Sequence, residues 1–184
     1  MPEWSRVARR IRVPLGFAFA ACYLWLARPT LRSMLVGLVL VLIGLWIRAL
    51  ASGHVRKNEA LATTGPYAYT RNPLYLGSLL MGIGFAVMGR SWWIGLALVA
   101  MFFAIYLPVI RGEEAFLRNK FADFQDYASR VPRLFPRLTP HADESRVDAG
   151  FSMVLYRKHR EYNATFGVVA LIALLIVKMR FWPS

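Results

Sequence analysis

Five apolar runs limit the folds that this 184-residue chain can adopt. Each run is close to, or short of, the roughly 20 residues that a helix needs to cross a bilayer, and aromatic or basic residues at the ends can extend it. One such run could be a buried helix of a soluble domain, but five leave too little polar chain to cover them. We therefore predict an all-α integral membrane helical bundle of about five transmembrane helices. The runs are residues 13–27, 34–51, 74–89, 91–110 and 164–177.

The composition agrees with this fold class. Hydrophobic residues make up 57% of the chain and charged residues 18%, against an apolar share of roughly 45–50% in soluble domains. The net charge of +13 could indicate a nucleic-acid partner, but such a protein would not carry several long apolar runs. We predict membrane lipid and a lipophilic small molecule as partners, and no nucleic acid.

Lys and Arg are distributed unevenly between the apolar runs. The N-terminus, residues 52–73 and residues 111–163 hold seventeen of them, whereas the alternate segments hold five. The positive-inside rule then places the N-terminus and the two rich segments in the cytoplasm. The first run could instead belong to a cleaved signal peptide, but cleavage after Ala27 would put Trp25 where a small residue is preferred. We expect a retained helix and a multi-pass protein.

The chain offers few metal ligands. Cys22 is the only cysteine, which excludes an internal disulfide and a cysteine-based metal site. His54, His141 and His159 are scattered and lack the spacing of metal ligands. The sequence predicts no metal site.

We predict one domain over residues 1–184. Its parts are an N-terminal helical hairpin over 13–51, a core over 52–137, and a C-terminal loop with the last helix over 138–184.

An amphipathic helix is predicted over residues 113–131. Leu117, Phe121, Phe124 and Ala128 recur at helical spacing, with charged and polar residues between them. We expect this helix to lie at the cytoplasmic membrane interface with its apolar face down. The stretch 151–163 is also expected to be helical and to lead into the last span.

The segment TTGPYAYTRNPLYLGS, residues 63–78, interrupts the apolar runs with a polar and aromatic connector. Gly65 and Pro66 predict a turn. Asn72 precedes a proline and is therefore pushed out of the α region, while Pro73 suits the first turn of the next helix. The free N–H groups of that helix start could bind a carboxylate or phosphate, and the tyrosines could contact a flat ring or a cation. An interfacial aromatic belt with a helix cap would use the same residues.

A second polar stretch, Arg111-Gly112-Glu113-Glu114, follows the fourth apolar run. Two acids at a helix start can simply offset the helix dipole. A glutamate at the membrane boundary could also bind an ammonium or sulfonium group.

Two motifs in these stretches resemble the signatures of the isoprenylcysteine carboxyl methyltransferase family. GPYAYTRNPLYLG is similar to the family pattern Gly-x-Tyr-x-x-x-Arg-His-Pro-x-Tyr-x-Gly, and EEAFLRNKFADFQDYASRVPRLFP resembles the second signature, which begins Glu-Glu-x-x-Leu and ends Val-Pro-x-x-x-Pro. The resemblance covers roughly residues 50–137, and related phospholipid methyltransferases share the general pattern.

The resemblance implies an integral membrane enzyme that moves a methyl group from S-adenosyl-L-methionine, bound on the cytoplasmic side, to a lipophilic small-molecule or lipidated substrate. Glu113 would be the acidic contact with the donor, with Glu114 as the near alternative. The positions implied for the cofactor are Ala60, Leu61, Ala62, Tyr67, Asn72, Pro73, Leu74, Tyr75 and Glu113.

Two positions depart from the family pattern. The histidine of Arg-His-Pro is Asn72 here, whose amide donates and accepts hydrogen bonds but cannot carry a titrating proton. Val109 stands where eukaryotic members have a substrate-binding arginine, and Arg111 is the nearest substitute.

Methyl transfer from a sulfonium requires alignment and exclusion of water more than acid–base chemistry, and alignment can contribute about 7–11 kcal/mol. Carboxyl O-methylation of an isoprenylcysteine-like or isoprenoid acceptor is the predicted reaction, with Arg71 or Arg111 orienting the carboxylate. An amine acceptor would need a base, for which Glu114 is the candidate. The catalytic residues predicted are Arg71, Arg111 and Glu114.

Three alternatives remain at this point. They are a phospholipid N-methyltransferase, an NADPH-dependent membrane reductase of the sterol type, and a membrane scaffold protein without turnover. The adjacent acids Glu113 and Glu114 favour a cationic donor over NADPH, whose additional phosphate would favour basic residues.

Overall fold

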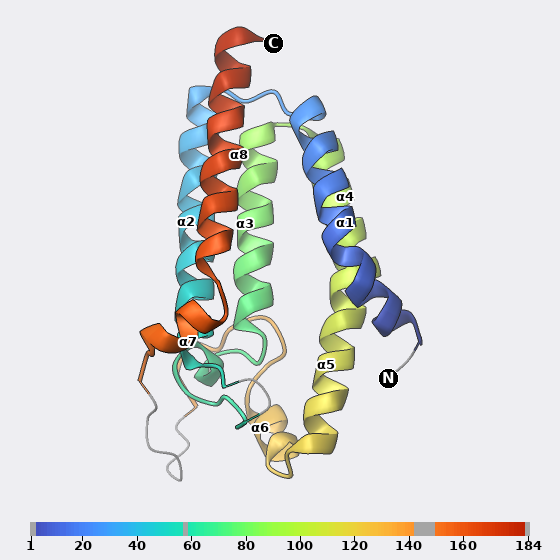
Figure 1. Cartoon of the computed structure of the whole chain (residues 1–184), viewed down its shortest axis with the longest axis vertical. Helices are drawn as coiled ribbons and strands as arrows, with labels where there is room; N and C mark the ends of the chain where they lie inside the picture. Colours follow the sequence, from blue (N-terminus) through green and yellow to red (C-terminus); the bar gives the residue numbers. More distant parts are fainter. Residues whose placement is uncertain (1–2, 57–58, 142–149, 183–184) are drawn as a thin grey trace.

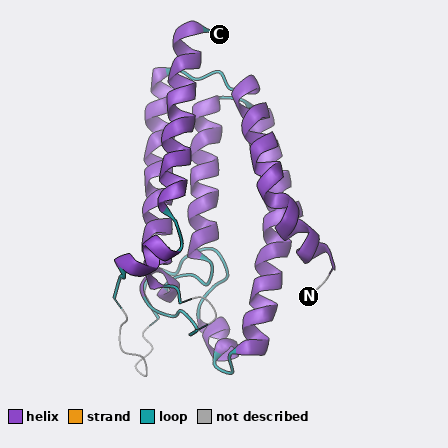
Figure 2. Cartoon of the chain, viewed as in Figure 1, coloured by secondary structure: helices purple, strands orange, loops and turns teal. Residues whose placement is uncertain are grey.

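The computed structural model describes residues 3–56, 59–141 and 150–182, and every regular element in these ranges is a helix (Figure 2). The long helices are α1 (Glu3–Leu26), α2 (Leu31–His54), α3 (Pro73–Gly89), α4 (Trp92–Met101), α5 (Leu107–Lys120) and α8 (Tyr162–Phe181). The short elements are the 3₁₀ helix η1 (Gly65–Ala68), the π-helical turn η2 (Phe102–Tyr106), α6 (Phe124–Arg130) and α7 (Met153–Lys158).

The long helices form an elongated bundle (Figure 1). Helices α2, α3 and α8 lie together, and α1 lies alongside the column formed by α4 and α5. The short elements η1, α6 and α7 gather at one end of the bundle, whereas the α1–α2 loop and the C-terminal end of α8 lie at the other (Figure 1).

The helices have the lengths and composition of membrane spans. Among the described residues, three helical segments are long and apolar enough to cross a bilayer, namely Leu31–His54, Trp92–Lys120 and Tyr162–Phe181. Two shorter apolar helices, Pro14–Leu26 and Pro73–Gly89, lie beside them. The predicted all-α membrane bundle is confirmed.

Helices α2 and α3 touch through glycine. Gly37 and Gly44 of α2 face Gly84 and Gly77 of α3, and a Cβ atom added to Gly44 would stand only 2.5 Å from the Gly77 carbonyl oxygen. The glycines of each helix are seven residues apart, so they lie on one face. Small residues at such positions let two helix backbones approach closely inside a membrane.

Substituting Gly44 with alanine is expected to destabilise the protein by about 1–3 kcal/mol, because the new methyl group meets backbone that cannot move aside. Gly167 of α8 is the matched control, since a Cβ atom there meets nothing within 4 Å. Gly167→Ala should stabilise the protein by up to about 1 kcal/mol through helix propensity. Denaturant unfolding in detergent micelles measures both; equal shifts of the same sign would contradict the close contact.

The prediction of one helix over 113–131 is wrong. The helix of the fourth span continues as α5 to Lys120, where the chain becomes extended at Phe121 and restarts as α6. The apolar residues of the predicted stripe do pack together, but against Leu61 in a cluster with Phe124 and Tyr127. The stripe therefore covers the connector between α2 and α3.

The stretch 151–163 is helical in two pieces. Helix α7 ends at Lys158, and Arg160 adopts a left-handed backbone conformation with φ of 52° before α8 begins. Glu161, at this junction, forms an ion pair with Arg48 of α2. Arg48 also donates a hydrogen bond to the Ser78 hydroxyl, so one guanidinium joins α2, α3 and the start of α8.

Candidate active site

The connector between α2 and α3 contains a left-handed glycine. Gly65 has φ of +58°, a region in which residues with a side chain are strained, and a Cβ atom there would meet the His54 ring at 2.5 Å. Pro66 then occupies the first turn of η1, as the sequence predicts. The chain reaches α3 at Pro73, whose missing N–H belongs to the unpaired first turn of a helix.

The connector is held by the segment that follows α6. The Arg71 N–H donates to the Pro132 carbonyl at 2.9 Å, and the Arg137 N–H donates to the Tyr69 carbonyl at 3.0 Å. The Thr70 hydroxyl donates to the Leu134 carbonyl at 3.1 Å. These bonds place the two signature stretches of the sequence side by side.

Asn72 and Glu114 form the junction between the two signatures. The Asn72 side-chain amide donates to Glu114 Oε1 at 3.0 Å and to the Arg133 carbonyl at 2.9 Å. Arg133 Nε donates to Glu114 Oε2 at 2.9 Å, and Arg71 Nε lies 3.7 Å from Oε1. Glu114 is only 5% exposed. A buried carboxylate with these partners joins α3, α5 and the 131–137 segment.

Two buried polar groups of the connector lack hydrogen-bond partners among the described residues. They are Arg71 Nε, which is too far from Glu114 for a hydrogen bond, and the Thr63 hydroxyl. Buried donors without partners are uncommon and costly. Both groups belong to the connector, and both suit a ligand that brings oxygen or nitrogen acceptors.

Tyr67 of the connector and Tyr127 of α6 are both buried. The Tyr127 hydroxyl donates to the Tyr67 carbonyl at 2.8 Å. Burial raises the pKa of both phenols above its ordinary value, so each stays protonated. The negative charges of Glu113 and Glu161 add to the increase in the pKa of Tyr67. Glu113 itself is half-buried.

The other cofactor positions implied by the sequence differ in burial. Ala60 is exposed, the Leu61 side chain is packed in the cluster with Phe124, and Ala62 is half-buried. Pro73 is buried in the first turn of α3, and Leu74 beside it is half-buried.

Arg111 differs from the other predicted catalytic residues in its exposure to solvent. It is exposed on α5, whereas Arg71 and Glu114 are enclosed. Arg133, which the sequence analysis did not single out, supplies the closest guanidinium contact to Glu114. Arg133 directly follows the Val-Pro pair of the second signature, and this place within the signature is the signal that could have identified it.

An apolar cavity of about 340 Å³ opens within the bundle. Tyr75, one helical turn after Asn72, lines it, and its ring packs edge-on against Tyr106 at 6.0 Å between centroids. Ser78 is also in the wall, and its hydroxyl accepts the hydrogen bond from Arg48. The remaining wall is largely apolar and includes Phe19, Leu79, Phe85, Leu98, Met101, Phe102 and Leu171. A cavity of this volume suits a lipophilic group.

The π-helical turn η2 shapes one side of the cavity. The Leu107 N–H donates to the Phe102 carbonyl, five residues back instead of four. Pro108 lacks an N–H and cannot form the regular bond to residue 104, which favours this wider turn. Phe102 and Tyr106, the two ends of the turn, both line the cavity.

Within the described ranges, no three His, Cys, Asp or Glu side chains are grouped so that they could hold a metal ion.

These features define a helical membrane protein with a buried polar junction and an apolar cavity that starts one helical turn along α3 from Asn72. The model of the phospholipid methyltransferase family matches residues 31–123, half of the chain, and the chain belongs to this family of membrane methyltransferases. The match confirms the predicted relationship with the isoprenylcysteine carboxyl methyltransferases and the phospholipid methyltransferases.

Two curated relatives are named for metal resistance. The chain is 38% identical over 122 residues to the cobalt-zinc-cadmium resistance protein CzcN of Cupriavidus metallidurans, and 36% identical over 122 residues to the nickel-cobalt-cadmium resistance protein NccN of Alcaligenes xylosoxydans xylosoxydans. Each alignment covers 66% of this chain and 56% of the relative, so the chain spans little more than half of their length. No solved structure matches the chain significantly.

Proposed function

We propose that this chain is an S-adenosylmethionine-dependent methyltransferase that acts on a lipophilic carboxylate. Tyr75 carries the proposal, because it lines the apolar cavity one turn after Asn72, whose amide binds Glu114. A lipophilic tail in the cavity would therefore bring its head group to the polar junction. The connector, with Tyr67, Glu113 and the unpartnered Arg71 Nε, would receive the methyl donor and the acceptor head group.

The charges of the junction support a role for each side chain. The Glu114 carboxylate already contacts Asn72, Arg71 and Arg133, so its role is to position these side chains. The neighbouring Glu113 would then be the carboxylate that contacts the sulfonium. Arg71, rather than Arg111, is the residue that would bind the acceptor carboxylate, because the N–H of its buried Nε donates no hydrogen bond among the described residues.

Bound S-adenosylmethionine would supply a methyl group whose bond to sulfur breaks with both electrons moving to sulfur, while the acceptor oxygen forms the new C–O bond to give a methyl ester and a neutral thioether. No proton moves in this exchange, so the residues need only to hold the acceptor in line and keep water out. Burial of Tyr67 and the apolar cavity wall both limit access of water.

The acceptor is tested by transferring labelled methyl from S-adenosylmethionine to membrane lipid extract with the purified full chain. Alkaline hydrolysis of the product distinguishes the acceptors, because a methyl ester releases labelled methanol and an N-methyl group does not. We expect alkali-labile label. Stable label on a phospholipid amine would instead support the N-methyltransferase alternative, which the family's phospholipid acceptors favour.

A Glu113→Gln substitution is expected to weaken binding of S-adenosylhomocysteine and S-adenosylmethionine unequally. Loss of a charged contact costs about 1.5–3 kcal/mol, so affinity for the cationic donor should decrease about tenfold to hundredfold, and affinity for the neutral product less. Isothermal titration calorimetry in detergent measures both. Glu59→Gln is the control, since Glu59 forms an exposed ion pair with Lys158. Unchanged donor affinity would remove Glu113 from the site, and binding of NADPH instead would support a reductase.

The two relatives are named for metal resistance. We propose that this chain also contributes to metal resistance, and that it does so through the product of its methyl transfer. Expression in a metal-sensitive bacterial host should increase growth in cobalt, zinc or cadmium, and the Glu113→Gln variant should lose this effect. Equal protection by both forms would favour a scaffold role that needs no methyl transfer.

A further inference from the structure

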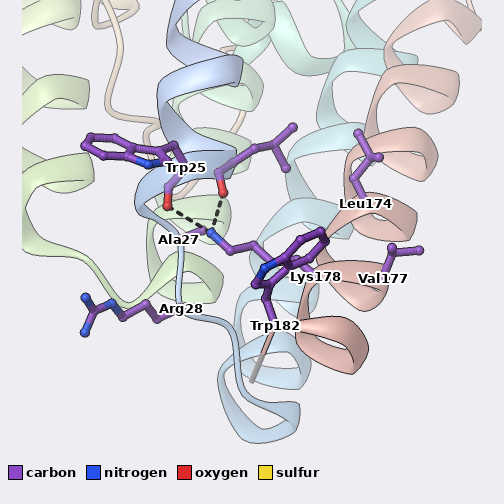
Figure 3. Close-up of a pocket in the computed structure, with 8 residues that line it drawn as sticks. Trp25, Ala27, Arg28, Leu174, Val177, Lys178 and Trp182 are labelled. Carbon is purple, nitrogen blue, oxygen red and sulfur yellow. Dashed lines mark hydrogen bonds between the residues drawn. The ribbon is translucent and has the colours of Figure 1, made fainter. Parts of the chain in front are cut away.

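A second cleft lies at the end of the bundle opposite the candidate active site. It has a volume of about 630 Å³ and lies between the end of α1 and the last turns of α8 (Figure 3). Its lining residues are Leu24, Trp25, Ala27, Arg28, Leu174, Val177, Lys178 and Trp182.

Lys178 reaches from α8 to the end of α1. Its ammonium donates to the carbonyl oxygens of Leu24 and Trp25, the latter at 2.9 Å (Figure 3). These carbonyls belong to the last turn of α1, which leaves them without partners inside the helix. An ammonium has three N–H donors, so Lys178 retains one donor and its positive charge for a ligand in the cleft.

The end of the bundle that holds the cleft is uniformly basic. Its cations are Arg28, Arg32, Arg90, Lys178 and Arg180, and no Asp or Glu occurs in the sequence between residues 4 and 58, 60 and 112, or 162 and 184. Arg28 lines the cleft, is exposed, and extends its side chain away from the ribbon (Figure 3). It can therefore turn toward an anion at the mouth of the cleft.

The walls of the cleft suit a molecule that is apolar as well as anionic. Leu174 and Val177 present exposed apolar surface on α8, and Trp25 and Trp182 are 81% and 72% exposed. Exposed tryptophans beside basic residues are typical of the level at which lipid head groups meet acyl chains. A free inorganic anion would make no use of these apolar walls.

We propose that this cleft binds one anionic phospholipid. Its phosphate accepts hydrogen bonds from Lys178 and Arg28, and an acyl chain packs along Leu174 and Val177. The lipid would bridge α1 and α8, which Lys178 already joins. The site is separate from the methyl-transfer site and does not depend on the proposed function.

The test uses the full chain in a zwitterionic detergent with added dioleoyl phosphatidylglycerol or dioleoyl phosphatidylcholine. Native mass spectrometry counts bound lipid, and the thermal midpoint follows the stabilisation that binding produces. We expect one phosphatidylglycerol per chain, bound at least tenfold more tightly than phosphatidylcholine, together with a higher thermal midpoint.

Two substitutions locate the site. Lys178→Gln keeps donors for the α1 carbonyls but removes the charge, and Arg28→Gln removes the second cation. Each should weaken phosphatidylglycerol binding about tenfold. Arg32→Gln is the matched control, because Arg32 is an exposed cation near the same end, outside the cleft. Equal binding of phosphatidylcholine, an equal loss in Arg32→Gln, or an equal thermal shift with soluble glycerol phosphate would each overturn the proposal.

Discussion

Replacing Glu114 with alanine is expected to lower the free energy of unfolding by about 3 kcal/mol and to abolish methyl transfer. The substitution leaves the Asn72 amide without one acceptor and leaves the Arg71 and Arg133 guanidinium groups without their carboxylate. Removing one partner of a buried ion pair costs about 3–5 kcal/mol. The lower value applies here because the Arg133 side chain is 41% exposed. Denaturant unfolding in detergent and labelled-methyl transfer measure the two effects.

Asp126→Ala is the control for this prediction. Asp126 forms an ion pair with Arg130 on α6, with both side chains more than half exposed, so its loss should cost at most about 0.5 kcal/mol. Substitutions of the two glutamates should also have different effects. Glu113→Gln should weaken donor binding with little loss of stability, whereas Glu114→Ala should reduce both donor binding and stability. A stable Glu114→Ala protein with normal turnover would contradict the role of the junction.

Glu161→Ala is expected to destabilise the protein by about 3–5 kcal/mol and to loosen α8 from the rest of the bundle. Arg48 lies in an apolar helix, and its Nε is buried without a hydrogen-bond partner among the described residues. Without Glu161 the guanidinium keeps its charge but loses its counter-ion, in surroundings where unpaired charges are costly. Limited proteolysis between α7 and α8 and denaturant unfolding report the two effects.

A second substitution tests the cause. Replacing Arg48 with methionine in the Glu161→Ala background removes the unpaired charge and should recover most of the lost stability, because an apolar replacement of a buried ion pair is often neutral. Glu59→Ala in an exposed pair with Lys158 should have almost no effect. Failure of the double variant to recover would show that the ion pair is not what holds α8.

Local backbone chemistry made part of the site predictable. Gly65, Pro66 and Pro73 restrict their own dihedral angles, so the turn and the start of α3 could be predicted from these residues alone. The apolar runs were predictable for a similar reason, since their length and composition are properties of single segments.

Contacts between distant segments were not predictable in this way. Asn72 and Glu114 are 42 residues apart, and nothing in either stretch indicates that the amide would bind the second acid of the pair. The stripe from Leu117 to Ala128 had the right periodicity, but the periodicity did not indicate its contact with the distant residue Leu61. The break at Phe121 carries no proline or glycine that would have marked it. The seven-residue spacing of Gly37 and Gly44 was a visible signal for the α2–α3 contact.

The amide at position 72 has a consequence for how the site would respond to pH. An imidazole at the same point could gain a proton as the pH falls and would then be a cation near two arginines. Asn72 keeps the same donors at every physiological acidity. The hydrogen bonds that join Asn72 to the second signature segment therefore need no titrating proton at position 72.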